Sequence, residues 1–322
     1  MAHRQEQGAA VVMALFIVVL CVLATTPLVW ALFATSKTIS VSNARAQSHQ
    51  IVLSGLDWAR IILREDARIS TTDNLTEPWA VPLADSQISE SLMRDGDNNS
   101  NLDDREAVLY GQIEDAQGRF NLRNLVVGSD QQEQWQNAFG RLCQLLGIPQ
   151  SQKEAIEQAL LLMYPDLEAI EGNNNEQAND DQFFSTIVEQ KVPAITWEEF
   201  RTDYGLTGTT WAQLQPHVVM LTRTTPVNVN TASAEVLYAV VEGLDYGGAQ
   251  AAVNYRERVT FNSLNDLRAV WGAQVTLNSD FIGVSSDFFR VGGQVQLGQA
   301  VSSVNAILER KDGKVFVVWR QD

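Results

Sequence analysis

Residues 9–34, AAVVMALFIVVLCVLATTPLVWALFA, decide the fold, because this run contains no charged side chain. A helix needs about 20 apolar residues to span a bilayer, and the run has 26. Pro27 interrupts it, but a membrane helix tolerates one proline with a kink. A cleaved secretory signal has an apolar region of only about 7–15 residues, and a buried core helix is the other alternative. The length favours a single membrane-spanning helix over both.

The helix is predicted to continue beyond the membrane. Apolar residues recur there at steps of three and four, and polar residues fill the opposite face, which is the pattern of an amphipathic helix. The apolar positions are Ile51, Val52, Gly55, Leu56, Ala59, Ile62 and Leu63, and the polar ones are Gln50, Asp57, Arg60 and Arg64. One helix of about 55–60 residues would then run from the membrane into a soluble domain, longer than an ordinary globular helix.

The whole chain is acidic and has the composition of a folded protein. Its 322 residues include 23 Lys and Arg against 39 Asp and Glu, a formal net charge of −16, and 45% are hydrophobic. At about 150 residues per domain, this length predicts about two domains. The composition excludes collagen-like and wholly disordered chains, and two cysteines exclude a disulfide scaffold. The negative charge disfavours general binding to nucleic acid or anionic lipid.

The soluble part is predicted to be α+β. Residues 71–105 have the composition of a loop, 107–113 alternate as a strand does, and a turn at Gly118 leads to a returning strand at 120–122. From residue 125 to 285 the period is mainly helical. Capping boxes are predicted from Ser151 with Glu154, and from Thr196 with Glu199. Strands return at 288–297, 301–310 and 315–320, with a hairpin turn at Asp312-Gly313. This order predicts one sheet interrupted by a helical insertion.

Residues 227–270 resemble the helix-hairpin-helix motif of DNA-binding proteins. Thr231 is expected to start one helix, Gly243 and Gly247 to frame a tight turn, and Ser263 with Asp266 to cap a third helix. Backbone amides at such a turn can hold a phosphate.

The charges of this segment argue against DNA binding. Glu242 and Asp245 lie in the turn and repel phosphate, and the nearby bases Arg256, Arg258 and Arg268 are few. We therefore favour a packing module, with DNA binding as the alternative.

Residues 95–106, DGDNNSNLDDRE, have the spacing of a calcium-binding EF-hand loop. Oxygen-bearing side chains stand at loop positions 1, 3, 5, 7, 9 and 12, which are Asp95, Asp97, Asn99, Asn101, Asp103 and Glu106. Ser100 stands where this loop usually has glycine, and the following residues favour a strand rather than a helix. The sequence thus predicts a Ca²⁺ site, with a solvated acidic loop as the alternative.

The amino end resembles the type IV prepilins and pseudopilins. A short polar leader ends at Gly8, followed by Ala9, Ala10 and the uninterrupted apolar helix. The resemblance implies cleavage between Gly8 and Ala9 by prepilin peptidase, with methylation of the new amino terminus. Such a cut leaves the apolar helix on the mature protein.

One position narrows the resemblance to a single family. Counted from Ala9, the fifth residue is Met13, where most pilins carry Glu. A carboxylate inside a bilayer costs about 2.5–3.5 kcal/mol unless it is paired, and in pilins it is thought to pair with the amino terminus of the subunit above. A subunit without this Glu resembles the minor pseudopilin K family of the type II secretion system. The segment EDAQGRFNLRNLV (114–126) and the final hairpin are also in the style of that family.

The resemblance implies a fold and a set of boundaries. A long helix would pack on a pilin-like antiparallel sheet that carries a large inserted all-helical domain with the helix-hairpin-helix-like segment. The expected regions are a leader (1–8), a transmembrane helix (9–34), its periplasmic continuation (35–70), the first part of the sheet with the acidic loop (71–124), the helical insertion (125–285) and the carboxyl-terminal hairpins (286–322).

The resemblance also implies a function. The chain would be a single-pass protein of the bacterial inner membrane, with its large carboxyl-terminal part in the periplasm. It would cap the pseudopilus with minor pseudopilins I and J, help initiate assembly, and help export folded periplasmic proteins across the outer membrane. Other pseudopilins, membrane lipid, prepilin peptidase and secreted cargo are the further implied partners. A DNA-uptake pseudopilin is the alternative.

The family also binds calcium in its helical insertion, at an aspartate-rich segment with Trp-Ile-Asp. This sequence has Met163-Tyr-Pro-Asp166 instead, and Glu171, Glu176, Asp180 and Asp181 are weaker candidate ligands.

The sequence predicts no enzyme. Its three histidines, His3, His49 and His217, are scattered, and the chain lacks phosphate-loop and nucleophile-elbow motifs and zinc-ligand spacing. Cys143 lies on the apolar face of a predicted helix and is expected in the core. A membrane-anchored hydrolase is the rival reading, and it lacks a convergent acid/base constellation.

Overall fold

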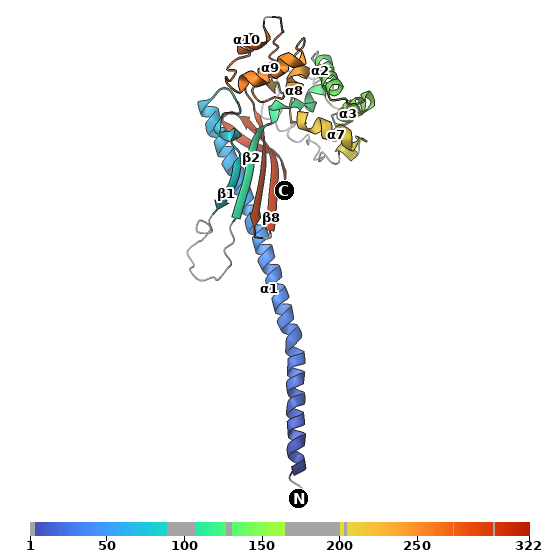
Figure 1. Cartoon of the computed structure of the whole chain (residues 1–322), viewed down its shortest axis with the longest axis vertical. Coiled ribbons are helices and arrows are strands. Elements are labelled where there is room, and N and C mark those ends of the chain that lie inside the picture. The colour runs from blue at the N-terminus through green and yellow to red at the C-terminus, as the bar shows by residue number, and fades with distance from the viewer. Residues whose placement is uncertain are drawn as a thin grey trace, which may run out of the picture.

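One very long helix runs from the amino-terminal region into the folded head of the molecule. The computed structural model describes residues 4–88, 107–126, 131–164, 200–202, 205–272, 274–298 and 300–322. Helix α1 (Arg4–Ile69) has 66 residues and includes Pro27. Its amino-terminal half extends away from the head, and its carboxyl-terminal half lies along one side of the sheet (Figure 1). The prediction of a continuous helix is confirmed, and α1 exceeds the predicted length because it starts upstream of Ala9.

A five-stranded antiparallel sheet packs on the upper half of α1. The strands lie in the order β1 (Leu83–Ile88), β2 (Ala107–Asp115), β7 (Phe288–Leu297), β8 (Ala300–Lys311) and β9 (Lys314–Gln321). The predicted strands at the carboxyl end are confirmed, and Asp312 and Gly313 both have positive φ in the β8–β9 turn. Because β2 pairs directly with β7, the chain between them is an insertion into the sheet.

Two predictions for the first part of the sheet are wrong. Residues 83–88 were expected to be loop, but they form β1, because an edge strand requires only backbone hydrogen bonds to its neighbour β2. The strand at 120–122 does not return along β2. Instead β3 (Phe120–Asn121) pairs in parallel with β4 (Val218–Val219). Both edges of β2 are already occupied, by β1 and β7.

The insertion forms a helical unit at the end of the sheet farthest from the amino terminus (Figure 1). Its described α-helices are α2 (Gln132–Leu145), α3 (Gln150–Met163), α7 (Gly208–Leu214), α8 (Ala234–Val240), α9 (Tyr246–Arg256) and α10 (Arg268–Trp271). Short 3-10 turns η3 (Ala116–Gly118), η4 (Leu122–Val126), η5 (Gln215–His217) and η6 (Leu264–Leu267), and the parallel pair β5 (Val227–Asn228) and β6 (Ile282–Gly283), connect them.

Aromatic side chains form the centre of the helical unit. Phe120 lies 5.5 Å from Trp135 and 5.5 Å from Phe139, measured between ring centroids. Trp135 also stacks on Phe281 at 4.2 Å. These contacts join α2 to residues on both sides of the insertion, so its core closes around its two connections to the sheet.

Helix starts in the insertion differ in part from the sequence predictions. The capping box of Ser263 and Asp266 is confirmed. The one at Ser151 and Glu154 is wrong: α3 begins at Gln150, directly after Pro149, with no side-chain cap. The fixed φ of proline starts the helix two residues earlier than the predicted cap at Ser151. The predicted box at residues 196–199 lies outside the described residues.

The starts of α8 and α9 also differ. Ser233 caps α8, whereas the hydroxyl group of Thr231 donates to Asp115 at 2.6 Å. Thr231 is therefore committed to a buried carboxylate instead of a helix start. Gly243 has the positive φ of the turn, but Gly247 lies inside α9.

Helix α1 and the sheet share a separate core. Leu56, Ala59 and Leu63 of α1 pack against Trp79 and Phe289, and the rings of Trp79 and Phe289 meet edge to face at 5.3 Å. Trp79 comes from the 3-10 turn η1 (Pro78–Ala80), which covers one side of α1. The sheet thus holds the soluble half of α1 through apolar contacts.

Truncating this core should destabilise the head. Phe289 has no exposed surface, so Phe289→Ala is expected to lower the free energy of unfolding by about 3–5 kcal/mol. Phe316→Ala is the matched control, because the Phe316 side chain is 48% exposed in the same sheet. It should cost less than about 1 kcal/mol. Denaturant unfolding of the protein in detergent measures both, and equal losses would contradict this packing.

Candidate functional site

The amino-terminal half of α1 is the largest exposed apolar surface of the described residues. The described side chains between Val11 and Phe33 are exposed, including Met13 and Trp30. By length and composition, this helix is suited to cross a membrane. Removing apolar surface from water is favourable by a free energy of about 25 cal/mol per Å². This half of α1 is therefore suited to lie in lipid or among other apolar helices.

The predicted processing residues lie at the start of this helix. Gly8 and Ala9 both fall within α1, immediately before the exposed apolar run. Cleavage between them stays a prediction.

A buried polar cluster joins the sheet to the insertion. At its centre, Asp115 ends β2 and accepts hydrogen bonds from the hydroxyls of Thr231 and Ser286 at 2.6 and 2.7 Å. It also accepts from the side-chain amide of Asn228 and the backbone amide of Gln117, both at 2.8 Å. Burial raises the pKa of Asp115, and the four donors oppose that rise. These donors come from both ends of the insertion, so one carboxylate fixes its two connections.

Arg310 of β8 extends the cluster to the end of α1. Its guanidinium donates to both oxygens of Asp73 at 2.7 Å, to Asp66 at 3.0 Å and to the Ser286 carbonyl at 2.8 Å. Burial raises the pKa of Asp73 to about 7, although Arg310 opposes the rise. Asp66, Asp73 and Glu77 place carboxylate oxygens within 4.8 Å of one another. Because Arg310 binds two of these carboxylates, the arrangement is an ion-pair cluster.

The turn between α8 and α9 is unsuited to hold a phosphate. Asp245 caps α9 by accepting from the backbone amide of Gly248 at 2.6 Å, so an anion of the chain itself already uses that amide. Arg256 points inward and donates to the carbonyls of Val229, at 2.7 Å, and Ala232. This segment therefore packs within the head, as the sequence interpretation favoured.

Three side chains of reactive types, Cys143, His217 and Glu235, are buried or held in contacts of the fold. Burial raises the pKa of Cys143 to about 12, so its thiol stays protonated near neutral pH. Nδ1 of His217 lies 3.2 Å from the Ser233 hydroxyl, but that hydroxyl caps α8. The nearby Glu235 accepts from the Tyr246 hydroxyl at 2.8 Å. Serine, histidine and glutamate are thus each engaged in a contact of the fold.

The predicted calcium ligands lie outside the described residues. This applies to Asp95, Asp97, Asn99, Asn101, Asp103 and Glu106, and to the weaker candidates Glu171, Glu176, Asp180 and Asp181. Calcium binding therefore stays a prediction.

Comparison with known proteins decides the family. Two models described as "Type II secretion system (T2SS), protein K" match residues 118–223 and 227–285. Type II secretion system protein K of Pseudomonas aeruginosa is 30% identical over 99% of this chain and 93% of its own length. This chain belongs to the type II secretion system protein K family. The resemblance drawn from Gly8, Ala9 and Met13 is thereby confirmed.

A solved structure shares the fold of this chain. One chain of the crystal structure of the GspK-GspI-GspJ complex from the enterotoxigenic Escherichia coli type 2 secretion system superposes with a TM-score of 0.57. The sequences are 16% identical, and the match covers 88% of this chain and 98% of that one. The helix-hairpin-helix-like segment lies within the protein K match at 227–285, so it gives no support to a DNA-uptake protein.

The sequence interpretation missed the buried polar cluster. Asp115, Asn228 and Ser286 are far apart in the chain, and no motif predicts that they meet. The available signal was the carboxylate of Asp115 at the end of an alternating strand, and the fold buries this side chain.

Stability of the head should depend on the protonation of Asp73. Its pKa is about 7 in the folded state and near its ordinary value when unfolded, so the folded state binds the proton more tightly. This contribution is fully present below the ordinary value of 3.8 and is lost as the pH rises to about 7. The melting temperature of the wild type should therefore contain a term that falls between about pH 4 and about pH 7 and levels off above it.

Thermal unfolding of two variants isolates that term. Asp73→Asn should remove it, whereas Asp57→Asn should keep it, because the Asp57 side chain is 69% exposed. The same pH dependence in Asp73→Asn and the wild type would refute the assignment.

Proposed function

We propose that this protein K caps the tip of the type II secretion pseudopilus. The observation that carries the proposal is the division of α1 into an exposed apolar half and a half held in a broad head. Such a subunit can join a bundle of helices through the lower half of α1. The helical insertion lies beyond the sheet, at the end farthest from the amino terminus (Figure 1). A head extended in this direction occupies the space that a further subunit would need.

The side chain at position 13 supports the same position. Met13 is apolar and exposed on α1, where most pilins have a glutamate that is thought to pair with the subunit above. A tip subunit has no subunit above it. An unpaired carboxylate at this depth would cost about 2.5–3.5 kcal/mol, so methionine suits the end of a filament.

We place the head in the periplasm, with α1 as the single span of the bacterial inner membrane. Prepilin peptidase would cut between Gly8 and Ala9 and leave the apolar run at the new amino terminus. The helix would rest in lipid before assembly and pack among neighbouring helices afterwards. No step of this assembly requires catalysis by the chain itself.

Minor pseudopilins I and J are the proposed partners at the tip. The support is the fold shared with a chain of the GspK-GspI-GspJ complex. Other pseudopilins would then follow below, and secreted cargo would meet the exposed head. In this role the protein helps to initiate the pseudopilus and to export folded periplasmic proteins.

Copurification tests this proposal. The full-length protein in detergent, mixed with full-length minor pseudopilins I and J, should give a stable one-to-one-to-one complex by size-exclusion chromatography with light scattering. A major pseudopilin in place of protein K is the control, and it should not complete the complex. Failure of the three proteins to associate, with and without calcium, would contradict the tip assignment.

We also propose that residues 95–106 bind Ca²⁺. The support is the spacing of six oxygen-bearing side chains, which ends in a glutamate suited to bind in bidentate fashion.

Calorimetric titration with Ca²⁺ tests the site. Glu106→Gln should weaken binding by about tenfold or more, because it removes a charged ligand. Glu133→Gln, on the exposed face of α2, should bind as the wild type does. Absence of binding to the wild type, or equal binding to Glu106→Gln, would refute the calcium site.

A further inference from the structure

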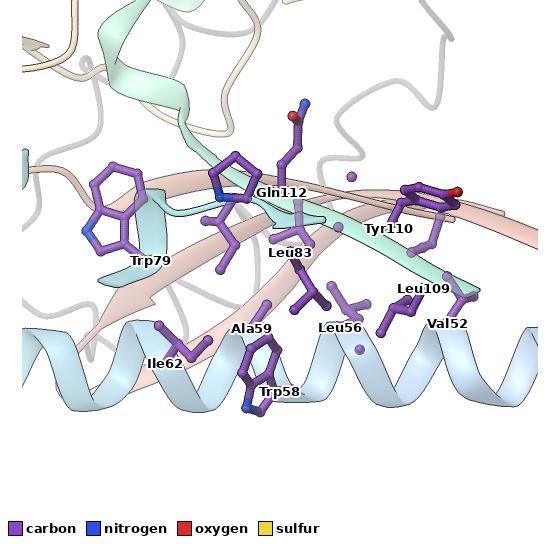
Figure 2. A pocket seen from close by; sticks show the side chains of 18 of the residues that line it. Val52, Leu56, Trp58, Ala59, Ile62, Trp79, Leu83, Leu109, Tyr110 and Gln112 are labelled. Carbon is purple, nitrogen blue, oxygen red and sulfur yellow. The ribbon is translucent and has the colours of Figure 1, made fainter. Parts of the chain in front are cut away.

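An apolar groove runs between α1 and the β1–β2 side of the sheet. Its cavity has a volume of about 200 Å³. Figure 2 shows Leu56, Ala59 and Ile62 rising from α1 toward Leu83 and Leu109 of the strands. We call this space the α1–β2 groove. It lies on the side of α1 opposite β9, because β1 and β2 are at the other end of the sheet.

Glycines create the hollow. Gly111 pairs with Gly293 across β2 and β7, and Gly55 lies on the wall that α1 contributes. An added Cβ would come no closer than 3.9 Å to Leu109 at Gly55, and no closer than 3.8 Å to the Gly292 carbonyl at Gly111. Both distances are ordinary contacts, so the packing of this chain does not require glycine at either position.

These glycines have an energetic cost. Glycine inside a helix or strand destabilises by about 0.5–1 kcal/mol relative to alanine. Gly55 and Gly111 lie in regular structure, and neither has a positive φ. In strands, glycine often marks the close approach of another backbone or a ligand. Since none of the described residues approaches closely at Gly55 or Gly111, the hollow is suited to a group from outside.

The rim indicates that the outside group belongs to a protein. Trp58 on α1 is 50% exposed and Val81 beyond η1 is 68% exposed, so apolar surface extends past the cavity. Exposed apolar surface continuous with a cavity is typical of protein interaction sites. A small ligand would fill the cavity and leave this rim in water.

The charge beside the groove indicates which side chains the partner protein would present there. At one end of the groove, the carboxylate of Glu77 accepts a hydrogen bond of 2.8 Å from the indole of Trp79, which lines the groove. Arg60 of α1 faces the other side, because it donates to the Val315 carbonyl of β9 at 3.1 Å and is paired with Asp57 at 3.0 Å. With a chain charge of −16, the surface favours a basic partner.

The distance of the groove from the apolar run of α1 indicates where the partner comes from. Gly55 follows the apolar run by about 20 residues of helix, or about 30 Å at 1.5 Å per residue. A neighbouring pseudopilin anchored in the same membrane would hold its own head at this height. A lipid headgroup would lie too far below.

We propose that the α1–β2 groove is the docking site for a large apolar side chain, flanked by Lys or Arg, that a neighbouring minor pseudopilin presents. This inference rests on the proposed function and assigns its contact surface. The apolar side chain enters between Gly55 and Gly111, beside Trp58 at the rim, and the flanking base meets Glu77.

Filling the hollow tests the proposal with the full-length proteins in detergent. Gly55→Leu should weaken assembly with minor pseudopilins I and J by at least about tenfold, as loss of a central anchor does. Ser54→Leu is the matched control, because it adds the same side chain at the next, exposed position of α1. The melting temperature of Gly55→Leu should not fall, since leucine favours helix more than glycine does.

A second variant keeps the test decisive if leucine distorts the helix. Trp58→Ala removes the half-exposed rim and should also weaken assembly by about tenfold or more. In addition, raising the salt concentration should weaken the wild-type complex, because the flanking base is expected to interact with an acidic rim. A complex that does not respond to salt would refute the basic flank.

The remaining outcomes separate this inference from the proposed function. If the wild type assembles and both Gly55→Leu and Trp58→Ala assemble equally well, the groove is not the contact and the tip function stands. If the wild type fails to assemble, both proposals are wrong. If light scattering shows a dimer of this chain alone that Gly55→Leu abolishes, the occupant is a second copy and the proposed partner is wrong.

Discussion

The antiparallel pairing of β2 with β7 is the constraint on which the head depends. Nine residue pairs, from Ala107 with Leu297 to Asp115 with Phe289, join strands that the whole insertion separates in sequence. The pairing brings both ends of the insertion to one place, completes the sheet on which α1 packs, and positions Phe289 against Trp79. Closing so long a loop carries an entropic cost, and the buried polar cluster forms where the loop closes.

The composition of that cluster follows from its position. Three segments of the chain meet at the end of β2. Each has polar backbone or side-chain groups whose hydrogen bonds are not made within a sheet or a helix. Asp115 accepts four hydrogen bonds there, and Arg310 ties Asp73 and Asp66 to β8. Removing one partner of such a cluster would leave a buried charge uncompensated, which is strongly destabilising. The cluster therefore ties the helical unit to the α1–sheet unit through buried hydrogen bonds and ion pairs.

Sequence patterns predicted the elements whose periodicity is strong and missed those that depend on neighbours. The apolar run and the 3.6-residue repeat predicted α1, and alternation with Asp312-Gly313 predicted β7 to β9. Strand β1 has no such pattern, because its partner β2 defines it. Threonine is a residue type that often caps helices, but the hydroxyl of Thr231 donates to the buried carboxylate of Asp115 instead. Contacts between distant segments also decide the polar cluster, and no local signal encodes them.

The two sides of α1 differ in a way that suits an asymmetric position in a filament. On the side toward β9, α1 and the sheet are joined by hydrogen bonds. Arg60 donates to the Val315 carbonyl at 3.1 Å, and Arg310 donates to the Leu63 carbonyl at 3.5 Å. Toward β1 the same helix presents glycine and half-exposed tryptophan over an apolar hollow. A subunit surrounded by equivalent neighbours would gain from contact surfaces on both sides. A subunit that ends the filament gains from one open side and one closed side, because surface without a neighbour stays in water, where exposed apolar area is unfavourable.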